Sequence, residues 1–398
     1  MSGINQNRSV RVLAVDAFHG GSHRQFVEGV IKHSRHQWHL LAGKPVRWKW
    51  RMRSGAIEMA NRAIAWMETG GQADVMLCTD MLDLPTWRGL LRQMLVRSRT
   101  HPGAARHPTA TMPQSAIVDL PALVYFHENQ FSYPQSPRAR TDHHYGYTNL
   151  MSAMAADACV FNSHFHRCDL LGHASDFVKR MPDGQRHHDM NWMEAKSHVI
   201  EPGIETVAAR RAKAAVTSER IAAGPIRIGW VSRWEHDKRP DRLVDLCHLL
   251  RAKQVRFELI LLGHGNDVAA KTALRTSFAR QVMHEGWVED RDAYCKWLAK
   301  MDVVVSTADH EFFGIGVCEA ASHGAVPVVP NRLSYPELFP RECLYDDLDD
   351  AVRLIGKLAE RQELVRLRTE CGKRLARLDI RETTDRLDEL LEQVARSN

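Results

Sequence analysis

Short apolar runs alternate with longer amphipathic stretches along both halves of the chain. A short continuous apolar run predicts a strand buried on both faces, and apolar positions spaced three and four apart predict a helix. The first half shows five such apolar runs and, after the first, a helical pattern over Ser22–Lys32 that we expect Ser22 to cap. The five predicted strands are Arg11–Ala17, Trp38–Ala42, Ala73–Thr79, Ala122–His127 and Ala158–Asn162. Strands that alternate with helices predict a parallel, doubly wound α/β sheet.

The same alternation starts again after a change of composition at Val199–Ile204. The predicted strands of the second half are Ile226–Ser232, Phe257–Leu262, Val282–Trp287, Asp302–Ser306, Val326–Val329 and Cys343–Tyr345. From Asp349 onward the pattern is helical. The sequence therefore predicts two Rossmann-like domains, residues 1–205 and 206–380, and a C-terminal helix over 381–398.

Composition narrows the class of protein. At roughly 150 residues per domain, 398 residues fit two domains. The eight cysteines form no C-x-x-C pair, and no stretch reaches the ~20 apolar residues that a membrane span needs. We expect a cytoplasmic protein with reduced cysteines, no signal peptide and no membrane contact. The net charge of +6 suits a phosphate-bearing partner, nucleotide or nucleic acid, but also an ordinary solvated surface rich in arginine.

Two carboxylates stand eight residues apart after the strand Asp302–Ser306. Glu311 is expected in the loop and Glu319 about two turns into the following helix, facing the same cleft. Between them, Phe312, Phe313 and Gly314 are candidate donor contacts: two phenylalanines exposed in a plain turn would be wasteful, and Gly314 allows the backbone to approach a ligand. Carboxylates can hold sugar and ribose hydroxyls, and the free N–H groups of a helix N-terminus can hold phosphate. The alternative interpretation is an ordinary strand–turn–helix segment in which both carboxylates are solvated surface charges.

Two cations follow the first strand of the second half. Arg233 and Lys238 come directly after Ile226–Ser232, where ligands of parallel sheets bind. A guanidinium can clamp a diphosphate, and an ammonium adds a point charge that stabilises a leaving diphosphate. The alternative is a charged loop before the next helix.

The first half offers two further strand ends. Gly20 and Gly21 permit a tight turn after the first strand, next to His23, and do not form the G-x-G-x-x-G pattern of dinucleotide binding. After the strand Ala122–His127, His127 could bond a sugar hydroxyl. The adjacent polar residues Glu128 and Asn129 are candidate acceptor contacts, as is His23. Plain turns and a structural histidine are the alternatives.

One segment interleaves cations with aromatic rings. Trp48, Lys49, Arg51 and Arg53 lie within the sequence RWKWRMR. Cations can meet phosphates while a ring stacks on an unpaired base, so the segment is a candidate RNA contact. An amphipathic segment with buried tryptophan and solvated arginine explains it equally well.

The motifs at the four strand ends, in this order along the chain, resemble those of the retaining GT-B glycosyltransferases. The resemblance implies two Rossmann-like domains facing a central cleft. Residues 1–205 would bind the acceptor, residues 206–380 would bind the nucleotide sugar, and the final helix would cross back onto the N-terminal domain. The resemblance also implies that Arg233 and Lys238 hold the donor diphosphate, Glu311 contacts the sugar and Glu319 the ribose. Gly20, Gly21 and His127 would form the N-terminal wall of the cleft. The chain departs from the pattern at Phe312, where many members have glycine, and at the bulky Trp234.

A narrower resemblance spans about residues 10 to 340. It rests on seven blocks: DAFHGGSHRQF (16–26), WKWRMRS (48–54), YFHENQ (125–130), YGYTN (145–149), FNSHF (161–165), RWEHDK (233–238) and STADHEFFG (306–314). These resemble the tRNA-queuosine α-mannosyltransferase family. The resemblance implies GDP-mannose as donor and the cyclopentene hydroxyl of queuosine in the anticodon of tRNA-Asp as acceptor, with retention of configuration.

We expect no metal and no cofactor, because Arg233, Lys238 and a helix N-terminus supply positive charge. The chain also shows no Ser-His-Asp or Cys-His set for a protein nucleophile. Three alternatives stay open: a GT-B enzyme with a glycan, lipid or small-molecule acceptor; a non-catalytic tRNA- or sugar-binding protein on the same scaffold; and a sugar-phosphate epimerase. The sequence leaves the oligomeric state open.

Overall fold

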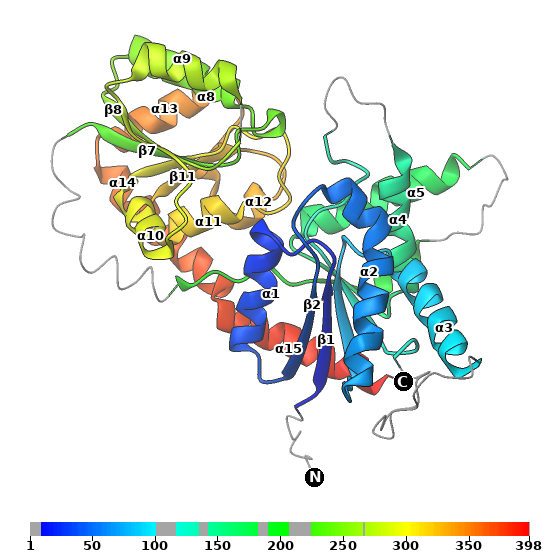
Figure 1. The fold of residues 1–398 in the computed structure, drawn as a ribbon. Coiled ribbons are helices and arrows are strands. Elements are labelled where there is room, and N and C mark those ends of the chain that lie inside the picture. The colour runs from blue at the N-terminus through cyan, green and yellow to red at the C-terminus, as the bar shows by residue number, and fades with distance from the viewer. Residues whose placement is uncertain are drawn as a thin grey trace. The chain divides into compact units, whose positions relative to one another are not determined.

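The computed structural model describes residues 9–100, 117–134, 142–181, 190–206, 224–265 and 267–397. The chain forms two compact units, shown in Figure 1. The N-terminal unit comprises Met1–Gly203 together with Arg381–Asn398, and the C-terminal unit comprises Ile204–Ile380. Each unit has its own sheet and its own hydrophobic core.

The N-terminal unit contains a six-stranded parallel sheet of order β2-β1-β3-β4-β5-β6. Its strands are β1 (Arg11–Asp16), β2 (Gln37–Ala42), β3 (Val75–Thr79), β4 (Ala122–Phe126), β5 (Ala158–Phe161) and β6 (Ser197–Val199). The five strands expected in this half are confirmed. The edge strand β6 was missed, since three residues centred on His198 give no apolar run.

Helices cover both faces of this sheet. They are α1 (Gly21–His33), α2 (Trp48–Glu68), α3 (Leu84–Thr100), α4 (His143–Ala155), α5 (His164–Lys179), α6 (Asn191–Ala195) and α15 (Ile380–Arg396). Helices α2 to α5 share one core, while α1 and α15 share the other. The expectation that Ser22 caps the helix is wrong, because Gly20 is the N-cap residue of α1 and Ser22 lies inside the helix.

The last helix, α15, is held on the N-terminal unit by apolar and polar contacts. Leu387 and Leu391 lie in the same core cluster as Phe26 of α1. At the end of α1, the Ser34 hydroxyl donates to Asp388 Oδ1 at 2.7 Å. These contacts explain why the chain's last segment belongs to the same compact unit as its first strand.

The C-terminal unit repeats the architecture around a parallel sheet of order β12-β11-β10-β7-β8-β9. Its strands are β7 (Ile226–Val231), β8 (Phe257–Leu262), β9 (Val282–Gly286), β10 (Val303–Val305), β11 (Val326–Pro330) and β12 (Leu344–Tyr345). All six expected strands are confirmed. The sheet places β10 directly beside β7, so the loops that follow these two strands meet at its carboxyl edge.

Helices and short 3-10 turns surround this second sheet. They are η1 (His236–Lys238), α8 (Pro240–Ala252), α9 (Val268–Phe278), α10 (Arg291–Lys300), α11 (Ile315–Ser322), α12 (Tyr335–Leu338), η2 (Arg341–Cys343), α13 (Leu348–Ala359), α14 (Gln362–Leu375) and η3 (Ala376–Leu378). The helical end of the chain is therefore confirmed, as three helices interrupted by short turns. In the part of the chain that the structure describes, no helix is both long and apolar enough to cross a membrane.

Candidate functional site

The loop after β10 carries the first candidate carboxylate. It leads into α11 through Gly314, whose φ of +83° lies in the left-handed region. A Cβ there would lie 2.8 Å from the Tyr335 ring, so glycine is needed for both conformation and space. Glu319 is the fifth residue of α11, which places it just over one turn into the helix, not two.

Lys238 and Glu311 form a partly buried ion pair at this edge of the sheet. Lys238 Nζ lies 3.1 Å from Glu311 Oε2, 3.2 Å from Asp237 Oδ2 and 2.9 Å from the His310 carbonyl oxygen. Burial tends to raise the pKa of Glu311, but the charge and hydrogen bond of Lys238 hold it below its ordinary value. Burial likewise tends to lower the pKa of Lys238, but Glu311 and Asp237 raise it overall. Both groups are thus charged at neutral pH.

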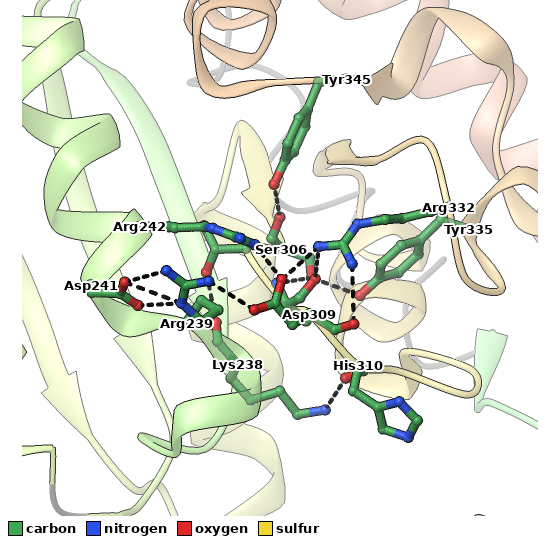
Figure 2. Close-up of polar contacts among 12 residues, drawn as sticks. Lys238, Arg239, Asp241, Arg242, Ser306, Asp309, His310, Arg332, Tyr335 and Tyr345 are labelled. Atoms are coloured by element: carbon green, nitrogen blue, oxygen red, sulfur yellow. Dashed lines mark hydrogen bonds and ion pairs between the residues drawn. The ribbon is translucent and has the colours of Figure 1, made fainter. Parts of the chain in front are cut away.

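Beside this pair, three guanidinium groups share one carboxylate (Figure 2). Asp309 accepts from Arg239 Nη1 at 2.8 Å, from Arg332 Nη2 at 3.0 Å, and from Arg242 Nη1. Burial tends to raise the pKa of Asp309, but these three donors lower it to about 2. Arg239 also bonds Asp241 through two nitrogens. Three guanidinium groups and two carboxylates, Asp309 and Asp241, leave one net positive charge beside the loop after β10.

Further hydrogen bonds fix the loop that carries Asp309. The Asp309 backbone N–H donates to the Asp237 carbonyl oxygen at 2.8 Å. The Tyr335 hydroxyl donates to Ser306 Oγ at 2.7 Å, and the Tyr345 hydroxyl donates to the Ser306 carbonyl at 2.8 Å (Figure 2). The loop after β7, helix α12 and the end of β12 therefore hold the β10 loop, and with it Glu311, in one position before any ligand arrives.

Glu319 is buried, so its interpretation as a solvated helix residue is wrong. Its carboxylate accepts from Arg291 Nη2 at 2.6 Å and from the Tyr294 hydroxyl at 2.9 Å. Burial, followed by the charge of Glu319, raises the pKa of Tyr294 well above its ordinary value, so the phenol remains a donor. The expected ribose contact of Glu319 stays a prediction.

The two phenylalanines are buried: Phe312 and Phe313 are each 4% exposed. Phe313 belongs to the core of the C-terminal unit, and the Phe312 ring packs edge-on against His310 at 4.4 Å. Apolar burial outweighs exposure in the loop because the core lies directly beneath it. Their side chains thus support the loop, and a contact between this segment and the donor stays a prediction.

In the loop after β7, neighbouring residues differ in how deeply they are buried. Trp234 is buried against Trp230, with ring centroids 4.9 Å apart, so its bulk fills the core. Arg233 is partly exposed, and its Nη1 lies 3.0 Å from Glu235 Oε2. Lys238 and Arg233 therefore differ: the first is built into the loop, and the second can reorient toward a ligand.

At the carboxyl edge of the N-terminal unit, Gly20 and Gly21 are required for different reasons. A Cβ on Gly20 would lie 2.3 Å from Pro45 Cβ, so the position has no room for one. Gly21 has open space around it but a φ of +54°, which L-residues adopt at a cost. Their donor contact stays a prediction.

A largely buried polar cluster lies at the carboxyl ends of β1, β3 and β4. The His23 and His127 rings are 4.1 Å apart, Asp80 Oδ1 accepts from the His127 backbone N–H at 3.1 Å, and His19 Nδ1 lies 2.9 Å from Asp16 Oδ2. Burial raises the pKa of Asp80 to about 7, while burial and the neighbouring histidines lower that of His127 well below its ordinary value. His127 is thus a neutral imidazole at pH 7. Asp80 was missed, since one carboxylate at a strand end gives no distinctive pattern.

Asn129 is not available to an acceptor, so its assignment as a tRNA contact is wrong. It is 0% exposed. Its Nδ2 donates to Asp169 at 2.9 Å, and its Oδ1 accepts from the Phe131 N–H at 3.1 Å, which uses its capacity to hold the loop after β4. Glu128 is half-buried and accepts from Gln130 Nε2 at 2.8 Å.

The basic aromatic segment forms the start of α2. Trp48 is half-buried against Tyr145 of α4 at 5.3 Å, and Lys49 Nζ lies 5.5 Å from the Trp48 ring centre. Arg53 lies over the same tyrosine at 5.0 Å. The structure therefore combines both interpretations of this segment, with one tryptophan packed and the cations outside it.

Two of the expected RNA-binding arginines already have acidic partners. Arg51 Nη1 pairs with Glu58, and the Arg51 side chain is largely covered. Arg53 Nη2 bonds Asp142 Oδ2 at 2.8 Å and remains partly exposed. An RNA contact by Arg51 would have to break its ion pair, which weakens that assignment.

The described residues contain no group of three or more His, Cys, Asp or Glu side chains arranged to hold a metal ion. All eight cysteines are free, and six of them are buried.

Family models match both units. The model for the N-terminal part of tRNA-queuosine alpha-mannosyltransferase matches residues 11–101 and 109–204. A model of glycosyl transferases group 1 matches residues 225–364. A tRNA-queuosine alpha-mannosyltransferase from Drosophila melanogaster is 31% identical over 341 residues, which is 84% of this chain and 83% of the relative.

Solved structures share the fold at low identity. Sucrose-phosphate synthase from Thermosynechococcus elongatus aligns with a TM-score of 0.66 and 13% identity over 98% of this chain and all of that one. Anabaena HepE in complex with UDP aligns with a TM-score of 0.62 and 14% identity, over 96% of this chain and all of that one. These likenesses show the GT-B fold.

Proposed function

The chain belongs to the tRNA-queuosine alpha-mannosyltransferase family, and from this we propose that it transfers mannose from GDP-mannose to the cyclopentene hydroxyl of queuosine in the anticodon of tRNA-Asp, with retention at the anomeric carbon. A glycosyltransferase of this kind must stabilise a leaving diphosphate and hold a sugar. The pairing of Lys238 with Glu311 at the carboxyl edge of the second sheet carries the proposal, because it sets a fixed ammonium beside a carboxylate.

The donor would bind on the C-terminal unit. Arg233, partly exposed after β7, would clamp the diphosphate, and Lys238 would add a charge that is already in place. Glu311 would accept hydrogen bonds from mannose hydroxyls. The α11 N-terminus and the excess charge around Asp309 would add positive potential as the diphosphate leaves.

The reaction would need no protein nucleophile and no metal. The acceptor hydroxyl attacks the anomeric carbon on the face that the diphosphate leaves, and its proton passes to the leaving phosphate oxygen. A neutral His127, next to His23 at the carboxyl edge of the first sheet, can accept or donate a hydrogen bond to a sugar hydroxyl without adding charge. We assign it a binding role.

The test is incubation of the purified protein with GDP-mannose and total tRNA that contains queuosine, then digestion and mass spectrometry of the nucleosides. We expect queuosine to gain one hexose, and tRNA that lacks queuosine to gain none. Glu311→Ala should abolish the product. If wild-type protein gives no product with this or other sugar nucleotides, the tRNA acceptor is excluded.

Two control reactions separate the alternatives. GDP-mannose hydrolysis without acceptor distinguishes an enzyme from a non-catalytic binding protein, since only an enzyme releases GDP. Hexose transfer to glycans or to liposome-bound acceptors, in place of tRNA, would support an enzyme with another acceptor.

A further inference from the structure

Trp50, in the first turn of α2, projects from the N-terminal unit. Its side chain is 60% exposed, whereas Trp48 two residues earlier is packed against Tyr145. Among the described residues, Trp50 has no aromatic ring or cation stacked on it. An apolar ring left in water forgoes the free energy that its burial would release. A partner that covers the ring would recover it.

Cations flank Trp50 along the sequence, with no acidic residue among them. The sequence between Gly43 and Ile57 contains five Lys and Arg residues and no Asp or Glu. The two arginines that follow Trp50 are paired, but three cations are exposed and have no carboxylate partner within the described residues; these are Lys44, Arg47 and Lys49. With Trp50 they form what we call the Trp50 surface. Its charge is complementary to a polyanion.

The Trp50 surface lies at the ligand-binding edge of the first sheet. Its first residues follow the carboxyl end of β2, where the Gly43 N–H donates to the Asp16 carbonyl at 2.8 Å. The His19 N–H donates back to the Gly43 carbonyl at 3.2 Å. The segment is therefore tied to the carboxyl end of β1, where His19 and His23 follow the strand and the His23 ring contacts that of His127.

We propose that the Trp50 surface binds the RNA acceptor: an unpaired base stacks on Trp50, and the phosphates on either side are held by Lys44, Arg47 and Lys49. This inference rests on the proposed function, since it names how this family member holds its tRNA. Every base offers a π-face to an indole, and single-stranded RNA is bound by combining such stacking with cations along the backbone.

The arrangement fits RNA better than a lipid surface. Besides Trp50, the exposed large apolar residues of this segment are only Val46 and Ile57, whereas the apolar face of α2 is buried in the core. A membrane-bound helix needs its long apolar face free. An anionic vesicle is therefore the control ligand.

The first test measures binding of a queuosine-containing anticodon stem-loop by fluorescence anisotropy, without donor. We expect Trp50→Ala to raise the Kd roughly 5- to 150-fold, the range of one lost base stack, and Trp50→Phe to restore most of the affinity. The matched control is Trp192→Ala: Trp192 is also exposed and has Lys196 4.6 Å over its ring, but it precedes β6 at the opposite edge of the sheet. This control should bind normally.

Salt dependence tests the cations. Each lost phosphate contact lowers the slope of log Kd against log salt by about 0.7 for a single strand, so Lys49→Glu should flatten it. Lys179→Glu, an exposed lysine at the far end of α5, should not. The inference is overturned if Trp50→Ala binds RNA as wild type does, or if it loses only binding to anionic vesicles. Failure of the proposed function would show differently, as absent mannosylation by wild type.

Discussion

Lys238→Met is the substitution for which the structure gives the clearest expectation. Methionine keeps the length of the side chain but removes the ammonium that three oxygen acceptors share. Lys238 is 11% exposed and its partner Asp237 is 1% exposed, so water replaces only a small part of the lost interaction. Removing one member of a buried ion pair costs about 3–5 kcal/mol, because the remaining charge is buried and unpaired. Since Glu311 keeps 24% of its side-chain exposure, we expect about 3 kcal/mol.

This loss should depend on pH. With Lys238 present, the pKa of Glu311 lies below its ordinary 4.5, so the stability from the pair is present above that value and disappears as pH falls through the lowered pKa. Without Lys238, burial raises the pKa of Glu311 instead, so the variant is weakest at neutral pH and recovers as the carboxylate takes up a proton. The gap between wild type and variant should therefore narrow from about pH 7 to about pH 5.

The assay is urea unfolding read by hydrogen exchange of the β7 and β10 peptides, which reports the free energy of unfolding of the C-terminal unit alone. A matched measurement uses the Glu311→Gln background, where one buried charge is already gone. There, Lys238→Met should cost at least about 1 kcal/mol less. A cost below about 1 kcal/mol in wild type, or one that is equal at all pH values and in both backgrounds, would refute the reasoning.

Three further predictions concern other parts of the structure. Asp80 has a pKa raised to about 7 by burial, so the native state binds an extra proton between the ordinary value and about pH 7, and stability falls as pH rises through that window. Asp80→Asn should flatten this dependence in thermal unfolding while still accepting from His127; an unchanged profile would contradict it. Gly43→Ala would place a Cβ 2.1 Å from the Ala17 carbonyl oxygen, and we expect it to prevent normal folding, seen as lost soluble yield and circular dichroism; wild-type stability would show that the backbone can move. Asp309→Asn removes the carboxylate charge that three arginines share. Because this loosens the loop that positions Glu311, kcat with GDP-mannose should fall roughly tenfold. An unaltered kcat would exclude this role for Asp309.

Much of the fold could be predicted from the chain because parallel strands buried on both faces are continuous apolar runs. Apolar runs such as Val303–Val305 and Val326–Pro330 can be recognised from the sequence without knowing which strands they pair with. The edge strand β6 does not, because it is short and half-polar. The start of α1 was misplaced because Ser22 suggested a cap, whereas the helix begins at Gly21 with Gly20 as its N-cap residue.

The candidate site was predictable only as a set of residues. Lys238 and Glu311 were both identified, but their contact spans 73 positions and exists because β10 pairs with β7. Asp309 and Asp80 were overlooked, since an aspartate after a strand has the same local pattern whether it is solvated or buried. Their roles come from the three arginines and the histidines that the fold places around them.

By itself, the sequence determined what depends on neighbours along the chain: the period of apolar positions, the glycines at turns, the motifs after strands and the family they match. Only the tertiary structure decided what depends on neighbours in space. Trp48 and Trp50 are two residues apart with similar surroundings in sequence, yet the packing of α2 on α4 covers one and exposes the other. Burial and charge pairing are properties of the environment that a side chain meets, and that environment is supplied by distant segments.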